Sequence, residues 1–226
     1  MNLLEAIEVE TAPGARASMI VLHGLGADGN DFVPVARELD LREAGPVRFV
    51  FPHAPSRPVT INGGYVMPAW YDILALDSGG LREDEAGLRE SQAQVEALIA
   101  REKERGVPAS RIVLAGFSQG CAMTLMTGLR HAERLAGLVG LSGYLPLATQ
   151  AEAERHDANR ETPIFLAHGT QDPVIPIARA RQSRDVLLAL GHAVEWHEYA
   201  MPHSVCAPEI ADLNRWLLRL LGAGGA

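Results

Sequence analysis

The stretch Ile112-Val113-Leu114-Ala115-Gly116-Phe117-Ser118-Gln119-Gly120 ends in a G-x-S-x-G motif. The apolar residues at 111–115 predict a buried strand, and the apolar spacing at 121–130 predicts a helix with one buried face. A serine between two glycines at this junction is typical of a strained turn called a nucleophile elbow, which exposes the serine hydroxyl above a sheet. The alternative is an ordinary strand-to-helix turn that contains Ser118.

Strands and helices are predicted to alternate along the chain. Apolar runs predict further strands at 18–23, 48–51, 137–141, 163–167 and 193–199, and helical spacing predicts helices at 31–41, 85–105, 178–190 and 208–221. Because successive parallel strands need crossover connections, we expect an α/β fold with a doubly wound, mainly parallel sheet and helices on both faces. The chain length favours a single domain over residues 1–226.

The segment 53–80 differs from the rest of the chain. It is rich in proline and glycine and contains the aromatic pair Trp70-Tyr71. We expect a long irregular segment, and its aromatic content favours an ordered wall of a binding site. Disorder is the alternative.

The composition narrows the classes of function. Hydrophobic residues make up 47% and charged residues 21% of the chain, as in ordinary globular proteins. The net charge of -8 argues against nucleic acid and anionic membranes as partners, because such binding needs clustered lysine and arginine. No apolar run approaches about 20 residues and the N-terminus is acidic, so we expect a cytoplasmic protein without stable membrane insertion.

Metal and disulfide chemistry are not indicated. Cys121 and Cys206 are too few for a disulfide scaffold and show no C-x-x-C spacing. The 8 histidines form no H-E-x-x-H pair. We therefore predict no metal site and no cofactor.

Two polar residues follow later strands and complement Ser118. A serine hydroxyl needs a base to take its proton and an acid to orient that base. Asp172 follows the strand at 163–167, and His203 follows the strand at 193–199. Since the chain order serine, aspartate, histidine is typical of this kind of sheet, we predict Ser118, Asp172 and His203 as catalytic residues.

Each of these assignments has an alternative. Asp172 also fits a turn-forming aspartate, and His203 fits an ordinary loop histidine. His168 competes for the role of base, although it lies at the end of its own strand and close before Asp172. Asp72 and Asp77 compete for the role of acid, although both precede the serine in the chain.

The anion that forms on an attacked carbonyl needs two aimed N–H donors. We predict the backbone N–H of Gln119 as one donor, because Gln119 directly follows the serine. The N–H of Leu25 is the other, because Gly24 and Gly26 let the loop after the first strand turn inward. The side chain of Leu25 then lines a pocket. The alternative is that these glycines only make a tight connection.

Several ordered segments resemble one known family over nearly the whole chain. They are LHGLGADGND at 22–31, PHAP at 52–55, AWYD at 69–72, GFSQG at 116–120, HGTQDPVIP at 168–176 and PHS at 202–204. The chain is similar to the α/β-hydrolase family of small bacterial carboxylesterases and acyl-protein thioesterases, the phospholipase/carboxylesterase group. The resemblance implies a triad of Ser118, Asp172 and His203, with Leu25 and Gln119 as oxyanion donors.

The resemblance also implies carboxylic esters or thioesters as substrates. The expected substrate-binding residues are Trp70, Leu25, Met67, Ile73 and Val174. The chain departs from the family at Cys121, where a second glycine is common. Cysteine is small enough for this position, but its thiol lies close to the nucleophile, and the sequence leaves its reactivity open.

The expected function is that of a serine hydrolase that cleaves esters or thioesters of short to medium acyl chains through an acyl-enzyme. One alternative is a noncatalytic ligand-binding protein on the hydrolase fold. A second is a protein that resembles dienelactone hydrolases, which use cysteine where this chain has Ser118. Small esters, lipid-like acyl substrates and acylated proteins remain open as substrates.

The chain also offers a set of apolar side chains around the aromatic pair. The set comprises Tyr65, Met67, Trp70, Ile73 and Leu74. They fit an acyl tail or a second subunit, which leaves a homodimer open, and simple loop packing is the alternative.

Overall fold

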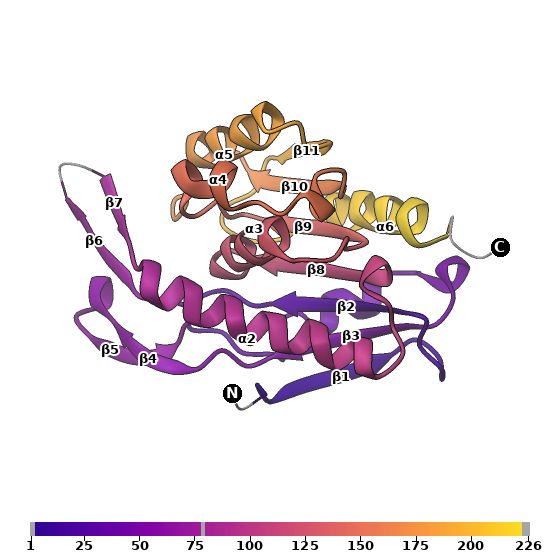
Figure 1. Ribbon diagram of the computed structural model, residues 1–226. Coiled ribbons are helices and arrows are strands. Elements are labelled where there is room, and N and C mark those ends of the chain that lie inside the picture. The colour runs from indigo at the N-terminus through magenta and orange to yellow at the C-terminus, as the bar shows by residue number, and fades with distance from the viewer. Residues whose placement is uncertain (1–2, 78–79, 223–226) are drawn as a thin grey trace.

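The computed structural model describes residues 3–77 and 80–222 and contains a central sheet of 7 strands (Figure 1). The strand order is β1-β3-β2-β8-β9-β10-β11. These strands are β1 (Ala6–Glu10), β2 (Ala17–Leu22), β3 (Val47–Pro52), β8 (Ile112–Phe117), β9 (Gly137–Leu141), β10 (Ile164–Gly169) and β11 (Val194–Tyr199). All neighbouring pairs are parallel except β1 and β3. The predicted mainly parallel sheet is confirmed.

Helices cover both faces of this sheet, as predicted. They are α1 (Val33–Glu38), α2 (Glu85–Glu104), α3 (Gln119–Arg130), α4 (Ala151–Glu154), α5 (Ile177–Ala189) and α6 (Ala207–Gly222). Successive side chains of a strand point to opposite faces of the sheet. Leu114 of β8 therefore packs in a core with residues of α2, α3 and α5, whereas Val113 packs in a second core with residues of α1 and α6.

The long helix α2 crosses in front of the strands in Figure 1. Asp84 caps its first turn, since its side chain accepts a hydrogen bond of 3.0 Å from the N–H of Gly87. Gly106 follows the helix with a φ of 91°, a conformation that favours glycine and stops the helix. The helix predicted at 85–105 is therefore present with nearly the expected bounds.

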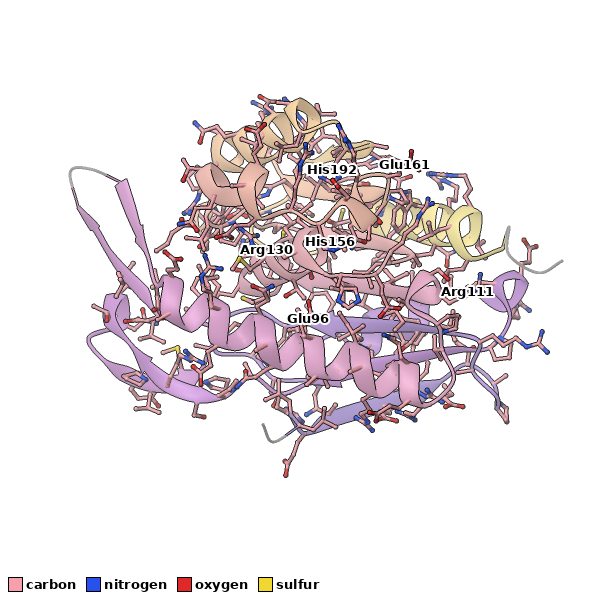
Figure 2. All side chains as sticks on the ribbon, viewed as in Figure 1. Glu96, Arg111, Arg130, His156, Glu161 and His192 are labelled. Atoms are coloured by element: carbon pink, nitrogen blue, oxygen red, sulfur yellow. The ribbon has the colours of Figure 1, made fainter. Side chains whose placement is uncertain are left out.

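Polar contacts join α2, α3 and α4 on the face shown in Figure 2, where Glu96 and Arg130 are labelled. Oε2 of Glu96 lies 2.6 Å from Nδ1 of His131. Nε of Arg130 donates to Oε2 of Glu154 over 2.7 Å. These contacts connect the end of α3, which follows the serine motif, to its two neighbouring helices.

The N-terminal half differs from the prediction in two places. Strand β1 was not predicted, because it is short and pairs antiparallel at the edge of the sheet, where no crossover helix marks it. Helix α1 spans only Val33–Glu38 rather than 31–41. The residues before it form turns instead, and the Asp28 carboxylate accepts a hydrogen bond of 2.7 Å from the N–H of Asn30.

The segment predicted to be irregular contains two antiparallel hairpins. Strand β4 (Ser56–Val59) pairs with β5 (Tyr65–Pro68), and β6 (Ile73–Asp77) pairs with β7 (Gly80–Glu83). The prolines misled the prediction, because a two-stranded ribbon leaves one side of each strand unpaired and so tolerates residues without an N–H. The segment is ordered at residues 53–77, as expected for a wall.

None of the helices within 3–77 and 80–222 is long and apolar enough to cross a membrane. The same residues include no group of three or more His, Cys, Asp or Glu side chains arranged to hold a metal ion.

Candidate active site

Ser118 lies in the turn between β8 and α3. Its backbone has φ 56° and ψ -116°, a region that residues with side chains rarely adopt. A Cβ at position 116 would lie 2.1 Å from the carbonyl oxygen of Gly120, and a Cβ at position 120 would lie 1.9 Å from that of Leu22. Only glycine fits at these two positions, so the motif residues are required by the close approach of the backbone.

Asp172 and His203 meet beyond the ends of β10 and β11. Oδ2 of Asp172 accepts a hydrogen bond of 2.7 Å from Nδ1 of His203. Its Oδ1 accepts two more from the N–H groups of Val174 at 2.8 Å and Ile175 at 2.9 Å. Since a carboxylate only accepts hydrogen bonds, Nδ1 of His203 carries a proton and its Nε2 is free to accept one.

Asp172 remains an anion in this setting. Burial raises the pKa of Asp172, but hydrogen bonds from His203 and from two backbone N–H groups outweigh this effect, so its net pKa lies below the ordinary value. The carboxylate can therefore orient His203 and stabilise the imidazolium that forms after proton transfer.

The loops that carry Asp172 and His203 pack tightly against each other. The N–H of Thr170 donates to the carbonyl of Tyr199 over 2.8 Å, and a Cβ at Gly169 would lie 2.3 Å from the carbonyl oxygen of Met201. The ring of His203 lies beside that of Phe117, with centroids 4.7 Å apart. Ser118 and His203 both line one cavity, so the structure brings the three predicted catalytic residues to the same edge of the sheet.

His168, the competing base, lies in a different environment. Its side chain is buried, and it is not among the residues that line the cavity. Its Nε2 lies 2.8 Å from the carbonyl oxygen of Ile175 and 3.3 Å from Oδ2 of Asp172, so Nε2 carries the proton and donates. Burial lowers the pKa of His168, which keeps it neutral. It contacts the acid, whereas His203 reaches the cavity.

Of the two residues that compete for the role of acid, Asp72 and Asp77, the structure describes the side chain of Asp72. Asp72 accepts hydrogen bonds from the N–H and the hydroxyl of Thr60, and thereby joins the two hairpins. The side chain of Asp77 lies outside the described residues. The carboxylate of Asp72 therefore has Thr60 as its partner, and not His203, among the described residues.

The loop predicted to supply an oxyanion donor lies directly beside the serine. A Cβ at Gly24 would lie 3.4 Å from Cβ of Ser118. Nε2 of His23 accepts a hydrogen bond of 3.0 Å from the N–H of Ala54, so its Nδ1 donates to the carbonyl of Gly24, 2.7 Å away. The carbonyl of His23 in turn accepts a bond of 2.9 Å from the indole N–H of Trp70. These contacts fix the loop that bears Leu25.

The side chain of Gln119 has a structural function that the sequence did not reveal. Its Oε1 accepts a hydrogen bond of 3.1 Å from the N–H of Trp70, and its Nε2 donates to the carbonyl of Tyr71 over 2.9 Å. Gln119 therefore attaches the start of α3 to the segment before β6. No local sequence pattern indicates this contact, because its partners lie far away in the chain.

The cavity has a volume of about 1170 Å³. Of the residues expected to bind substrate, Leu25, Ile73 and Val174 line it, whereas Trp70 and Met67 are not among the lining residues. Trp70 is fully buried in the core and supports the wall from behind. Tyr71, of the aromatic pair expected in the wall, also lines the cavity. Polar lining residues that the sequence analysis did not name as substrate-binding are Asp31, Asn62, Glu83, Tyr144, Thr149, Arg179, Gln182 and Ser183.

The thiol of Cys121 is not poised to react. The side chain is buried, and a Cβ at Gly140 or Gly143 would lie 2.7 Å or 2.6 Å from its Sγ. Burial raises the pKa of Cys121 to about 12, although backbone N–H groups of Tyr144 and Gly143 oppose this effect. The reactive thiolate is therefore almost absent near neutral pH.

Glu209 lies buried in the first turn of α6, next to the loop that bears His203. Its Oε2 accepts a hydrogen bond of 3.3 Å from the N–H of Cys206. Burial raises the pKa of Glu209 to about 7. Between the unfolded and the folded pKa the native state holds a proton that the unfolded chain releases, so the free energy of unfolding falls as pH rises across this window.

We expect this pH dependence to shrink in Glu209→Gln, which keeps an acceptor for Cys206 but does not titrate. The wild type should lose roughly 3 kcal/mol more stability than the variant between about pH 5 and about pH 8. Urea unfolding at both pH values measures this difference, with the exposed Glu152→Gln as control. An unchanged pH dependence in Glu209→Gln would show that Glu209 does not titrate as described.

The fold and the strained serine turn define an α/β-hydrolase. Residues 4–221 match the family described as Phospholipase/Carboxylesterase, and the chain belongs to this family. The comparisons give no support to a noncatalytic binding protein.

Relatives and solved structures agree with this assignment. The chain is 41% identical to acyl-protein thioesterase 1 of Yarrowia lipolytica, over 94% of this chain and 95% of that protein. It is 43% identical to acyl-protein thioesterase 1 of Neurospora crassa, over 91% and 87%. The crystal structure of Arabidopsis thaliana SOBER1 superposes with a TM-score of 0.86 and 30% identity, over 92% of this chain and 100% of that chain. That of Zea mays acyl-protein thioesterase 2 gives 0.83 and 29%, over 96% and 100%.

Proposed function

We propose that the protein hydrolyses carboxylic esters and thioesters of short to medium acyl chains through an acyl-enzyme formed on Ser118. The observation that carries this proposal is the hydrogen bond of 2.7 Å between Asp172 and His203 beside the strained serine turn. His203 acts as base, Asp172 orients it, and the N–H groups of Leu25 and Gln119 bind the oxyanion.

The reaction proceeds in two acyl transfers. Oγ of Ser118 attacks the carbonyl carbon while Nε2 of His203 takes its proton. The tetrahedral anion then collapses, and His203 gives the proton to the leaving alcohol or thiol. Water attacks the acyl-enzyme with His203 again as base, which releases the acid and restores Ser118. The residues of this chain supply each of these steps without a cofactor.

The lining of the cavity and the names of the relatives support the substrate class. Leu25, Ile73 and Val174 supply apolar surface for an acyl chain next to Ser118. Relatives named acyl-protein thioesterases favour thioesters and acylated proteins as substrates alongside small esters and lipid-like esters.

A panel of substrates tests the proposal. Purified protein should hydrolyse p-nitrophenyl esters and the matching acyl-coenzyme A thioesters, with the highest kcat/KM at short to medium chains in a series from acetyl to dodecanoyl. A fluorophosphonate should label the protein at Ser118. Failure to hydrolyse any ester or thioester of the series, together with no labelling, would refute the proposal.

Two further expectations stay predictions. A homodimer is testable by light scattering of the purified protein, and a cytoplasmic location by fractionation of cells.

The homodimer is suggested by exposed apolar side chains. These are Ile61, Tyr65 and Val66, which lie on or beside the β4–β5 hairpin and offer an apolar surface for a second subunit.

A further inference from the structure

The cavity contains a polar group beside its apolar lining. Arg179, in the first turn of α5, lies over the ring of Tyr144, with Cζ 3.4 Å from the ring centroid. The hydroxyl of Tyr144 lies 2.8 Å from that of Tyr71. All three side chains line the same cavity as Ser118 and His203.

This group has more hydrogen-bond donors than acceptors. When two hydroxyls bond to each other, one of their protons remains free to donate. The guanidinium of Arg179 brings several N–H donors, and stacking of its face on Tyr144 leaves its edge available. Among the described residues its carboxylate partner is Glu83, whose Oε1 is 4.0 Å away, beyond hydrogen-bond range. Both oxygens of Glu83 already accept from the N–H of Leu147, at 3.2 and 3.0 Å.

The surroundings keep these donors in place at neutral pH. Burial raises the pKa of Tyr71 well above its ordinary value and also raises that of Tyr144, although the charge of Arg179 opposes the latter shift. Both phenols therefore stay protonated. The N-terminal end of a helix carries a partial positive charge. Arg179 lies in the first turn of α5, so its charge and the helix dipole both make the electrostatic potential at this end of the cavity more positive.

The polar group is linked to the serine turn by short contacts. Nε2 of Gln119 donates to the carbonyl of Tyr71 over 2.9 Å. A Cβ at Gly143, the residue before Tyr144, would lie 2.8 Å from the carbonyl oxygen of Ser118. Because Ser118 and Arg179 line the same cavity, a substrate whose scissile carbonyl lies at Ser118 can place a second polar group on Arg179.

We infer that Arg179, together with the paired hydroxyls of Tyr71 and Tyr144, binds a carboxylate of the substrate and thereby selects acidic esters. A guanidinium edge matches a carboxylate in geometry and charge, and the phenol proton supplies a further donor. This inference rests on the proposed function and specifies its substrate class. The carboxylate belongs either to the acyl chain or to the leaving group, and the two sources are distinguished below.

Paired substrates test the inference. One series compares p-nitrophenyl butanoate with p-nitrophenyl hemiesters of succinic, glutaric and adipic acid, which place the carboxylate in the acyl chain. The other compares phenyl butanoate with its carboxyphenyl analogues, which place it in the leaving group. The wild type should show a kcat/KM at least about tenfold higher for the acidic member of one series.

The preference should depend on Arg179. In Arg179→Met the ratio of kcat/KM between acidic and neutral substrates should fall about tenfold to a hundredfold, mainly through KM. The matched control is Arg181→Met, which removes the same charge from the same helix at an exposed side chain paired with Glu198. This control should keep the wild-type ratio. Equal kcat/KM for acidic and neutral substrates in the wild type, or an equal fall of the ratio in Arg181→Met, would overturn the inference.

A binding measurement separates failure of this inference from failure of the proposed function. Two amides without a cleavable ester serve as calorimetry probes: glutarate monophenyl amide carries its carboxylate in the acyl part, and carboxyphenyl butanamide carries it in the part that would leave. One of them should bind the wild type more tightly than Arg179→Met by about tenfold or more. If neither probe binds the wild type more tightly than Arg179→Met, the inference is overturned even if neutral esters are hydrolysed. Selective binding by the wild type would support it even if no ester is turned over.

Discussion

Replacing Ser118 by alanine should lower kcat by on the order of 10⁶, because the base and the oxyanion donors then have no nucleophile to act with. Alanine retains the Cβ at the strained backbone position, whose φ is 56°, so the turn has no new steric reason to rearrange. The measurement is kcat on the best ester of the panel, with circular dichroism to show that the variant folds.

The exposed Ser110→Ala is the matched control and should keep wild-type activity. Mass spectrometry after rapid acid quenching should show an acyl adduct on the wild type and none on Ser118→Ala. Retention of more than about a hundredth of the wild-type kcat in a folded Ser118→Ala would contradict the assignment of Ser118 as nucleophile.

Replacing Asp172 by asparagine should lower kcat by on the order of 10⁴. The asparagine oxygen can still accept from the N–H groups of Val174 and Ile175, so the turn keeps its backbone contacts. Its NH₂ group then faces Nδ1 of His203, which favours the tautomer with the proton on Nε2. That tautomer cannot take the proton of Ser118.

The effect should appear in kcat with thermal stability close to that of the wild type. The exposed Asp157→Asn is the matched control and should leave kcat unchanged. A loss of less than about tenfold in a folded Asp172→Asn would show that Asp172 is not needed to orient His203. His168, whose Nε2 lies 3.3 Å from Oδ2 of Asp172, would then be tested as the alternative base.

The sheet and most helices were predictable because their signals are local. The apolar run of β8 reflects a strand that is buried on both faces, and the helical spacing of α2 reflects burial on a 3.6-residue period. The edge strand β1 and the hairpins of residues 56–83 lacked such signals, since edge ribbons are only partly buried and tolerate proline.

The positions of the candidate catalytic residues were predictable because these residues lie directly after the ends of strands. Ser118, Asp172 and His203 each follow a parallel strand, and parallel strands end at the same edge of a sheet. Their catalytic roles remain predictions that the variants above test. The cavity wall was less predictable: Trp70 is buried rather than exposed to the cavity.

The sequence by itself determined the strained turn at Ser118, because glycine is the residue type that leaves room for the close backbone approach at positions 116 and 120. It also determined the alternation of strands and helices. Only the tertiary structure decided that Arg179 lies over Tyr144, and that Gln119 holds Trp70 and Tyr71. The reason is physical: local steric and periodic constraints act between neighbours in the chain, whereas these contacts join side chains that only packing of the whole core brings together.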